Sequence, residues 1–191
     1  MDISGAVKTE TVFSANDIGA LPAAEMISDF HYASCGTLRG LRWGGYAFDD
    51  LWARLIEPRT RPEDRARFVV VHGSDGYRAS FRLDDLLDGK AFLATSLDGE
   101  ALDGERGGPW RLIVPALYGH KSVKAVCRVE LCRDLAGYRP MGARFLDHPR
   151  ARVALEERAR WVPGVILRFP LRALSRPVRR MAGGLSRLRQ I

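Results

Sequence analysis

Cysteine is scarce in this chain, and long apolar runs and a leader-like N-terminus are missing. The 191 residues include three cysteines, an odd number that argues against a disulfide framework. No run of about 18 apolar residues is present, so we expect no membrane-spanning helix. Residues 1–6 (MDISGA) have neither the basic nor the apolar region of a secretory signal. Together these features predict a cytoplasmic location.

Several common active-site motifs are missing as well. The sequence contains no G-x-G-x-x-G fingerprint, no P-loop and no nucleophile elbow. Cys127 and Cys132 lie five positions apart along an expected strand, which places them on opposite faces, and no neighbouring ligand accompanies them. We therefore interpret these two cysteines as packing residues.

The overall composition is that of a globular protein, with 46% apolar and 28% charged residues. This length suits one domain with an appendage. The net charge of +7 is unevenly distributed: residues 138–191 contain thirteen arginines, no lysine and three acidic residues, a net charge of +10, which leaves −3 for residues 1–137. The basic character therefore belongs to the C-terminal part, which weakens a nucleic-acid function for the whole fold.

Short alternating stretches predict a β-rich α+β domain with short helices. We expect strands over residues 8–13, 25–32, 41–46, 68–72, 77–83, 91–97, 112–117 and 125–131. We expect helices over residues 14–21, with Ser14 as the N-cap, over 48–56, ending before Pro58, and over 83–87. Residues 33–40, rich in small side chains, are predicted to form a loop.

The predicted domain covers residues 8–138 and is followed by a basic, partly helical extension over residues 139–191. Residues 149–161 have the spacing of an arginine-studded helix. Residues 175–188 place four apolar side chains three or four positions apart among arginines, a basic amphipathic pattern. This pattern predicts a contact with an acidic membrane surface or a membrane-bound redox partner. No stacking platform or recognition helix is evident, so we expect no nucleic-acid partner.

The most informative stretch is residues 107–124, GGPWRLIVPALYGHKSVK. Its first part, the glycine–proline motif (residues 107–115), is a turn followed by an apolar strand. Its second part, the lysine–serine motif (residues 118–124), presents His120, Lys121, Ser122 and Lys124 just before the next strand. Ammonium and hydroxyl groups donate hydrogen bonds to phosphate oxygens, and glycine lets the backbone come close. The alternative is that these lysines are ordinary solvated charges at strand ends.

Both motifs resemble the molybdopterin-binding oxidoreductase domain, the superfamily of sulfite oxidase and the bacterial methionine-sulfoxide reductase catalytic subunit. Those proteins carry G-x-P-x-R-L-V-V-P and then Y-G-x-K-S-I/V-K, and the chain keeps both residue types and spacing. The resemblance extends over roughly residues 12–138. It implies a mixed-sheet, sulfite-oxidase-type fold and a molybdenum–molybdopterin cofactor.

The metal ligand departs from the family pattern. The family places a cysteine thiolate on molybdenum, but counting back from Trp43 puts Tyr32, and not Cys35, at that position. Three readings stay open: Cys35 reaches the metal through a rearranged loop, Tyr32 supplies a phenolate oxygen, or the site has lost its protein ligand. A soft thiolate suits a high-valent metal, and a phenolate is a harder ligand.

The cofactor-binding residues match the family better. The resemblance implies that Arg111 contacts the pterin or its phosphate and that Ser122, Lys124 and the backbone at Val123 hold the phosphate. Guanidinium and ammonium groups both suit a phosphate dianion. Further candidates from the same resemblance are Arg106, His72, His120 and Lys121.

Two functions follow from this pattern. The first is a molybdopterin-dependent oxidoreductase that transfers an oxygen atom and electrons to or from a small-molecule substrate, with a redox partner protein. The second is a catalytically altered or inactive binding protein on the same fold, which docks to a membrane or redox partner through its basic C-terminal part.

Overall fold

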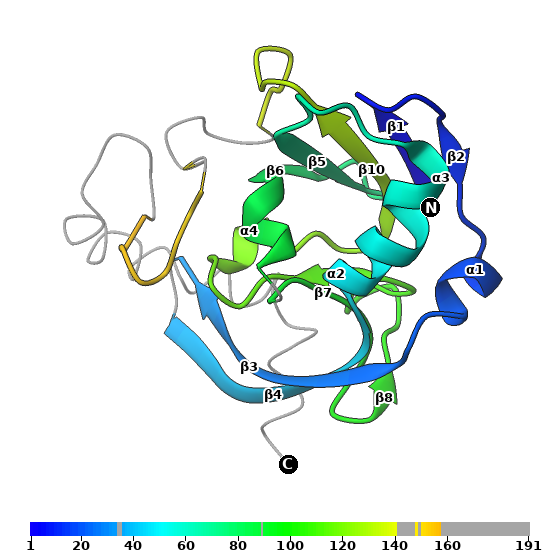
Figure 1. Cartoon of the computed structure of the whole chain (residues 1–191). Helices are drawn as coiled ribbons and strands as arrows, with labels where there is room; N and C mark the ends of the chain where they lie inside the picture. The colour runs from blue at the N-terminus through cyan, green and yellow to red at the C-terminus, as the bar shows by residue number, and fades with distance from the viewer. Residues whose placement is uncertain (34–35, 89, 141–147, 149, 158–191) are drawn as a thin grey trace.

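The computed structural model describes residues 1–33, 36–88, 90–140, 148 and 150–157. Two five-stranded sheets form its framework, joined by short helices (Figure 1). This arrangement confirms the predicted β-rich α+β class. No helix in the described part of the chain is long and apolar enough to cross a membrane.

The first sheet has the strand order β2-β1-β10-β5-β6. Strand β1 pairs with β10 in parallel. The other three pairings in this sheet, β1 with β2, β10 with β5 and β5 with β6, are antiparallel. The interior strand β5 is a nearly continuous apolar run whose valines are buried, as expected for a strand covered on both faces. The strands are β1 (Asp2–Gly5), β2 (Thr11–Val12), β5 (Phe68–Gly73), β6 (Arg78–Arg82) and β10 (Val126–Cys132).

The second sheet has the order β3-β4-β7-β8, and the short strand β9 also pairs with β7. Strands β3 and β4 form a long curved hairpin that runs along the lower part of the view in Figure 1. The strands are β3 (Ala24–Tyr32), β4 (Gly36–Ala47), β7 (Phe92–Leu97), β8 (Glu100–Ala101) and β9 (Arg111–Ile113). The predicted loop over residues 33–40 is wrong from Gly36 onward, because these residues pair with the end of β3.

The helices are short, as predicted. Helix α1 begins at the predicted N-cap: Asp17 N donates to Ser14 Oγ at 3.1 Å, and Ser14 N donates to Asp17 Oδ2 at 2.9 Å. The helical segments are α1 (Ala15–Gly19), α2 (Phe48–Leu51), the π-helical turn η1 (Trp52–Ile56), α3 (Glu57–Thr60), α4 (Leu83–Leu87) and the 3₁₀ turn η2 (Gly119–Lys121).

The predicted helix end before Pro58 is wrong, because the chain stays helical to Thr60. Pro58 lies in the first turn of α3, directly after the π-helical turn. A proline is tolerated in a first turn, where its missing N–H group would have no intrahelical partner. The sequence shows the proline but not the change in helical register that accommodates it.

The C-terminal part is described only at residues 148 and 150–157. We call residues 150–157 the strap. The predicted helix over residues 149–161 is wrong for this portion, because the strap consists of turns and one antiparallel bridge between Arg152 and Leu117. The rest of that helix and the amphipathic stretch over residues 175–188 lie outside the described residues. The domain boundary after residue 138 stays a prediction.

Candidate functional site

Folding brings the two motifs side by side. Ala125 N donates to the carbonyl of Gly107 at 2.8 Å, and Leu112 N donates to the carbonyl of Val123 at 2.9 Å. The glycine–proline motif therefore runs next to the end of the lysine–serine motif. This pairing brings Arg111 of the first motif next to Ser122 and Lys124 of the second.

Two glycines allow these segments to approach closely. Gly107 has a φ of +97°, and a Cβ atom there would lie 2.8 Å from Cβ and Cγ of Lys124. A Cβ atom on Gly119 would lie 2.5 Å from the Phe30 ring. Real side chains do not tolerate such distances, so Gly107 fits the Lys124 stem and Gly119 fits the end of β3.

Arg111 is the central charge of the site. Its side chain is 3% exposed and comes from β9. The Nε atom donates to Ser122 Oγ at 3.1 Å, and Nη1 donates to the carbonyl of Arg106 at 2.8 Å. The guanidinium carbon lies 5.3 Å from the ring centre of Phe30 and 6.0 Å from that of Trp43. Such contacts with aromatic faces favour a buried cation.

No carboxylate among the described residues forms an ion pair with Arg111. Burial lowers the pKa of Arg111 to about 10, and nearby Tyr32 opposes this shift. A buried cation without a counter-ion is costly. Arg111 is therefore a cation that an anionic ligand would stabilise.

Lys124 adds a second cation. Its half-buried ammonium donates to the carbonyl of Glu105 at 2.7 Å. Burial lowers the pKa of Lys124, and the charge of Arg111 lowers it further. The two cations are thus close enough to repel one another. A bound phosphate between them would replace repulsion by attraction, so the donor set fits the phosphate of a pterin cofactor.

Ser122 orients Arg111. Its hydroxyl accepts from Arg111 Nε and donates to the carbonyl of Leu112 at 2.7 Å. The single hydroxyl proton is committed to that carbonyl. We call Arg111, Ser122 and Lys124 the basic site, with the two cations available to an anion and the hydroxyl holding one of them in place.

Three other candidates from the lysine–serine motif point elsewhere or act through the backbone. Lys121 is buried, its ammonium donates to the carbonyl of Ser80 at 2.9 Å, and it lies 5.8 Å from the Phe81 ring. Val123 is fully buried, and its carbonyl binds Leu112. The carbonyl of His120 accepts from the hydroxyl of Tyr77. These residues shape the turn around the basic site.

Arg106 and His72 are engaged with carboxylates. Arg106 Nη1 lies 2.7 Å from Glu100 Oε2, and its pKa is raised mainly by that hydrogen bond. Its carbonyl, and not its guanidinium, contacts Arg111. His72 lies on β5 of the first sheet, with Nε2 2.9 Å from Glu130 Oε2. Neither side chain joins the basic site through a contact in the described part of the chain.

Of the two metal-ligand candidates, the structure describes Tyr32. Cys35 lies outside the described residues. Tyr32 ends β3, its ring lies edge-on to Phe30 with centres 5.1 Å apart, and it lies close enough to Arg111 to oppose the lowering of the Arg111 pKa by burial. Among the described residues no group of three histidine, cysteine or acidic side chains is placed to bind a metal ion.

Sequence reasoning missed the aromatic surroundings of Arg111. Phe30 and Trp43 belong to expected strands, and the sequence gives neither a role, yet both rings lie beside the guanidinium. Trp43 is fully buried, and its indole nitrogen has no hydrogen-bond partner in the described structure. The available signal was the β3–β4 pairing, which brings the inward-facing aromatic residues of a hairpin to one face.

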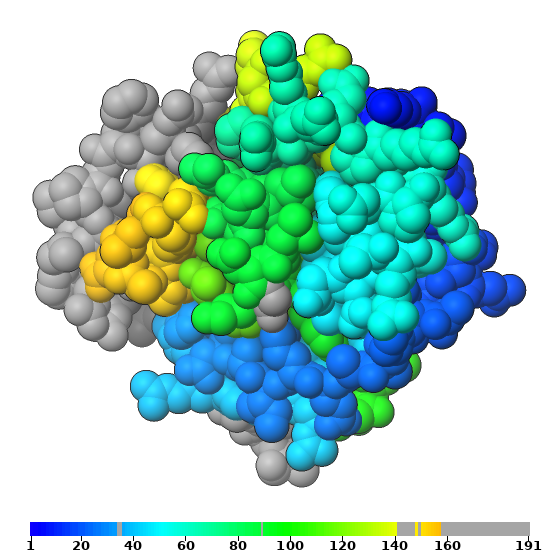
Figure 2. All heavy atoms as spheres, viewed as in Figure 1, coloured from blue at the N-terminus to red at the C-terminus, as the bar shows by residue number. Residues whose placement is uncertain are grey.

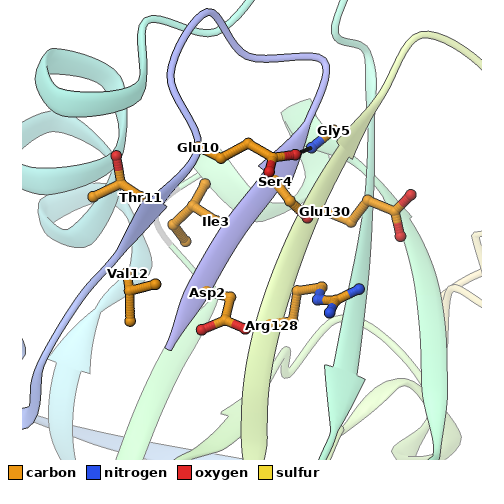
Figure 3. Close-up of a pocket in the computed structure, with 9 residues that line it drawn as sticks. All are labelled: Asp2, Ile3, Ser4, Gly5, Glu10, Thr11, Val12, Arg128 and Glu130. Atoms are coloured by element: carbon orange, nitrogen blue, oxygen red, sulfur yellow. Dashed lines mark hydrogen bonds between the residues drawn. The ribbon is translucent and has the colours of Figure 1, made fainter.

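A groove of about 410 Å³ lies on the first sheet, along β2, β1 and β10 (Figure 3). None of the candidate cofactor residues lines it. Its polar side chains are Asp2, Ser4, Glu10, Thr11, Arg128 and Glu130. The groove is therefore separate from the basic site.

The chain is similar to known proteins in both sequence and fold. Residues 1–136 match the profile of the oxidoreductase molybdopterin binding domain. The uncharacterized oxidoreductase YuiH of Bacillus subtilis (strain 168) is 28% identical over 138 residues, which are 70% of this chain and 65% of YuiH.

Two further relatives are protein-methionine-sulfoxide reductase catalytic subunits, both named MsrP. The one from Pseudomonas syringae pv. tomato is 31% identical over 54% of this chain and 34% of its own length. The one from Campylobacter jejuni subsp. jejuni is 25% identical over 70% of this chain and 49% of its own length. The chain thus spans 34–65% of the length of these curated relatives.

Among solved structures, the sulfane dehydrogenase SoxCD from Paracoccus pantotrophus superposes with a TM-score of 0.60 at 22% identity, over 70% of this chain and 38% of that chain. This similarity confirms the predicted sulfite-oxidase-type fold. The profile match covers 136 of the 191 residues and includes both motifs of the basic site. The chain therefore belongs to the oxidoreductase molybdopterin binding domain family.

Proposed function

We propose that this chain binds a molybdenum–molybdopterin cofactor through Arg111 and Lys124 and serves in an oxygen-atom and electron-transfer reaction. The family membership implies this cofactor. The observation that carries the proposal is Arg111, a buried guanidinium next to a second cation and without a carboxylate partner in the described structure. An anionic cofactor supplies the missing counter-charge.

Both cations keep hydrogen-bond donors for such a ligand. A guanidinium has five N–H groups, and Arg111 uses two on Ser122 and Arg106. An ammonium has three, and Lys124 uses one on Glu105. Ser122 holds the guanidinium plane, and the aromatic rings of Phe30 and Trp43 restrict its position. When bound, the cofactor supplies the redox-active metal on which oxygen-atom transfer takes place.

The substrate is a small molecule in this proposal. Two relatives bear the name of protein-methionine-sulfoxide reductase subunits, but the chain spans less than half of either. The proposed activity is therefore oxygen-atom and electron transfer, without a named substrate.

Expression of the full chain with an intact molybdenum-cofactor pathway tests this function. We expect molybdenum and pterin in the purified protein, measured by elemental analysis and by pterin fluorescence after oxidation. Arg111→Met and Lys124→Gln should lose both. A wild-type protein with neither molybdenum nor pterin would overturn the proposal.

A catalytically altered binding protein is the second candidate, and the position of Tyr32 favours it. Tyr32 stands at the family's cysteine position and lies close enough to Arg111 to act on its charge. Cys35→Ala and Tyr32→Phe separate the two functions. Loss of molybdenum in Cys35→Ala supports the oxidoreductase. If Cys35→Ala keeps bound metal and any activity, Cys35 is not a ligand and the altered site is favoured.

A further inference from the structure

The strap lies against the segment that leads into the basic site. Tyr118 N donates to the carbonyl of Ala151 at 2.9 Å, and Val153 N donates to the carbonyl of Ala116 at 2.9 Å. Arg152 and Leu117 form the antiparallel bridge between these two bonds. The strap thus adds a short strand-like pairing to residues 116–118. The family profile ends at residue 136, so the strap lies outside the matched region although its partner, residues 116–118, lies inside it.

An ion pair between Arg150 and Asp85 connects the strap to helix α4. Arg150 Nε donates to Asp85 Oδ2 at 3.0 Å, and Arg150 Nη2 donates to Asp85 Oδ1. The Asp85 side chain is only 10% exposed. Figure 2 shows the strap, in amber, on the surface beside the green segment that carries α4. A bidentate arginine–carboxylate pair fixes both distance and orientation, so Arg150 determines where the strap begins.

The strap also has an internal clasp. Arg152 Nε and Nη2 donate to the two carboxylate oxygens of Glu157 at 3.0 and 2.6 Å. The hydrogen bonds from Arg152 lower the pKa of Glu157 to about 2. Ala151, between the two arginines, is fully buried with a φ of +53°. These contacts close the strap into a compact turn on residues 116–118.

From residues 116–118 the contacts continue into the basic site. Tyr118 is the N-cap of η2, and its carbonyl accepts from Lys121 N at 2.8 Å. Ser122 N, one residue later, donates to the carbonyl of Gly119 at 3.0 Å. Ser122 then holds Arg111. The backbone that the strap fixes at Tyr118 is therefore the start of the turn that places Ser122.

We infer that the strap is a positioning element of the cofactor site: Arg150, anchored on Asp85, holds Tyr118 and η2 so that Ser122 keeps Arg111 ready for the cofactor. This inference rests on the proposed function. None of the strap residues contacts the basic site directly in the described structure, so the effect is carried through η2.

The test uses the full chain with the variants Arg150→Ala, Asp85→Ala, Arg150→Lys and the exchanged pair Arg150→Asp with Asp85→Arg. The matched control is Arg133→Ala, which removes another bidentate pair, that of Arg133 with Glu63 at 2.7 and 2.9 Å, next to the first sheet. Two quantities are measured: the rate of pterin and molybdenum loss from loaded protein, and amide hydrogen exchange at Tyr118 and Ser122.

Couplings carried through packed contacts change binding by roughly 2- to 30-fold. We expect Arg150→Ala and Asp85→Ala to accelerate cofactor loss within that range and to speed exchange at Tyr118 and Ser122. The two effects should not add when Arg150→Ala and Asp85→Ala are combined in one protein, because both remove the same pair. The exchanged pair and Arg150→Lys should recover part of the retention. Arg133→Ala should leave both measurements at wild-type values.

Cofactor loss and exchange that stay at wild-type values in Arg150→Ala would overturn the inference, as would an equal acceleration in Arg133→Ala. If Arg150→Ala does not fold, Glu157→Gln replaces it with the same expectations for cofactor loss and exchange; it removes the charge that Arg152 and His148 both contact and leaves the Arg150–Asp85 pair in place. If the wild-type protein carries no molybdenum or pterin, the proposed function fails. The amide hydrogen exchange at Tyr118 and Ser122 still tests the strap in that case, and unchanged exchange in Arg150→Ala would show that the strap does not position this turn.

Discussion

At the scale of single residues, the site depends on an arginine that the fold buries at a cost. Arg111 loses hydration and receives two neutral acceptors, Ser122 and the carbonyl of Arg106, in place of a carboxylate. Neutral acceptors do not offset the desolvation of a full charge. Such a residue is retained for a ligand and not for the stability of the empty protein.

Arg111→Met should therefore stabilise the cofactor-free protein while abolishing its function. Methionine fills similar space without a charge, and we expect the free energy of unfolding to rise by about 1 kcal/mol. Cofactor retention should fall at least about tenfold, because losing one partner of a buried charge pair costs about 2 kcal/mol or more. Urea unfolding of cofactor-free protein and pterin content of loaded protein measure the two effects.

The control is Arg54→Met, which removes an exposed ion pair with Asp50; neither the free energy of unfolding nor the pterin content should change. A destabilised Arg111→Met protein that retains pterin would contradict this account.

Lys124 gives the site a pH dependence of known sign. Its pKa in the folded protein lies below 10.5, mainly through burial and then through Arg111. Between the folded and unfolded pKa values the unfolded chain binds more protons, so the cofactor-free protein gains stability as pH rises through that window. Cofactor retention has the opposite sign, because only the protonated ammonium attracts phosphate.

Retention of the pterin, measured after equilibration at increasing pH up to about 10, should decline in the wild-type protein. Lys124→Arg should show a smaller decline, because an arginine at position 124 keeps its charge to higher pH than a lysine and only Arg111, whose pKa burial lowers to about 10, still loses charge near the end of this range. A wild-type protein whose retention is independent of pH would show that Lys124 does not face the phosphate.

At the scale of elements, the site is a pairing of two backbone segments that glycine makes possible. Gly107 lies against the Lys124 stem with a positive φ, and Gly119 lies against Phe30. Their distances leave no space for a methyl group. The motif glycines thus set where Lys124 and η2 lie relative to β9 and β3.

Gly107→Ala should destabilise the protein by about 1–3 kcal/mol, from backbone strain and the clash with Lys124. The matched control is Gly104→Ala in the same turn, where a Cβ atom would meet nothing within 4 Å and no positive φ is recorded. That change should stay within about 0.5 kcal/mol. Urea midpoints of the two variants give the comparison, and equal losses would show that the turn, and not the contact with Lys124, is sensitive.

The elements also show what the sequence could and could not predict. The N-cap at Ser14 was predictable because its bonds lie within four residues. The proximity of Arg111, Ser122 and Lys124 was expected from the family resemblance, which implies that all three bind one cofactor. Pro58 inside a helix was not, because a π-helical turn changes the register, and neither was the strap, whose position depends on distant residues such as Asp85. The isolation of Arg111 from carboxylates is likewise a property of packing.

At the scale of the whole molecule, charge is separated along the chain. Residues 138–191 carry a net charge of +10 and residues 1–137 carry −3. Two of the three described arginines in the basic part are neutralised locally, since Arg150 pairs with Asp85 and Arg152 with Glu157. Residues 175–191 contain five arginines and no acidic residue. We propose that this last stretch contacts an acidic surface, either an anionic membrane or a membrane-bound redox partner.

Deletion of residues 175–191 should lower binding to vesicles that contain anionic lipid by at least about tenfold, since each arginine near such a surface contributes about 1 kcal/mol. Co-sedimentation measures the bound fraction, and raising the ionic strength to about 1 M should release the wild-type protein because the Debye length falls to about 3 Å.

The control variant replaces only the charges and keeps the apolar side chains. It has glutamine in place of Arg176, Arg179, Arg180, Arg187 and Arg189. If that variant sediments with the vesicles as the wild-type protein does, the attraction is not electrostatic. If the deletion itself leaves binding unchanged, a membrane contact of residues 175–191 is excluded, and a redox partner protein becomes the surface to test.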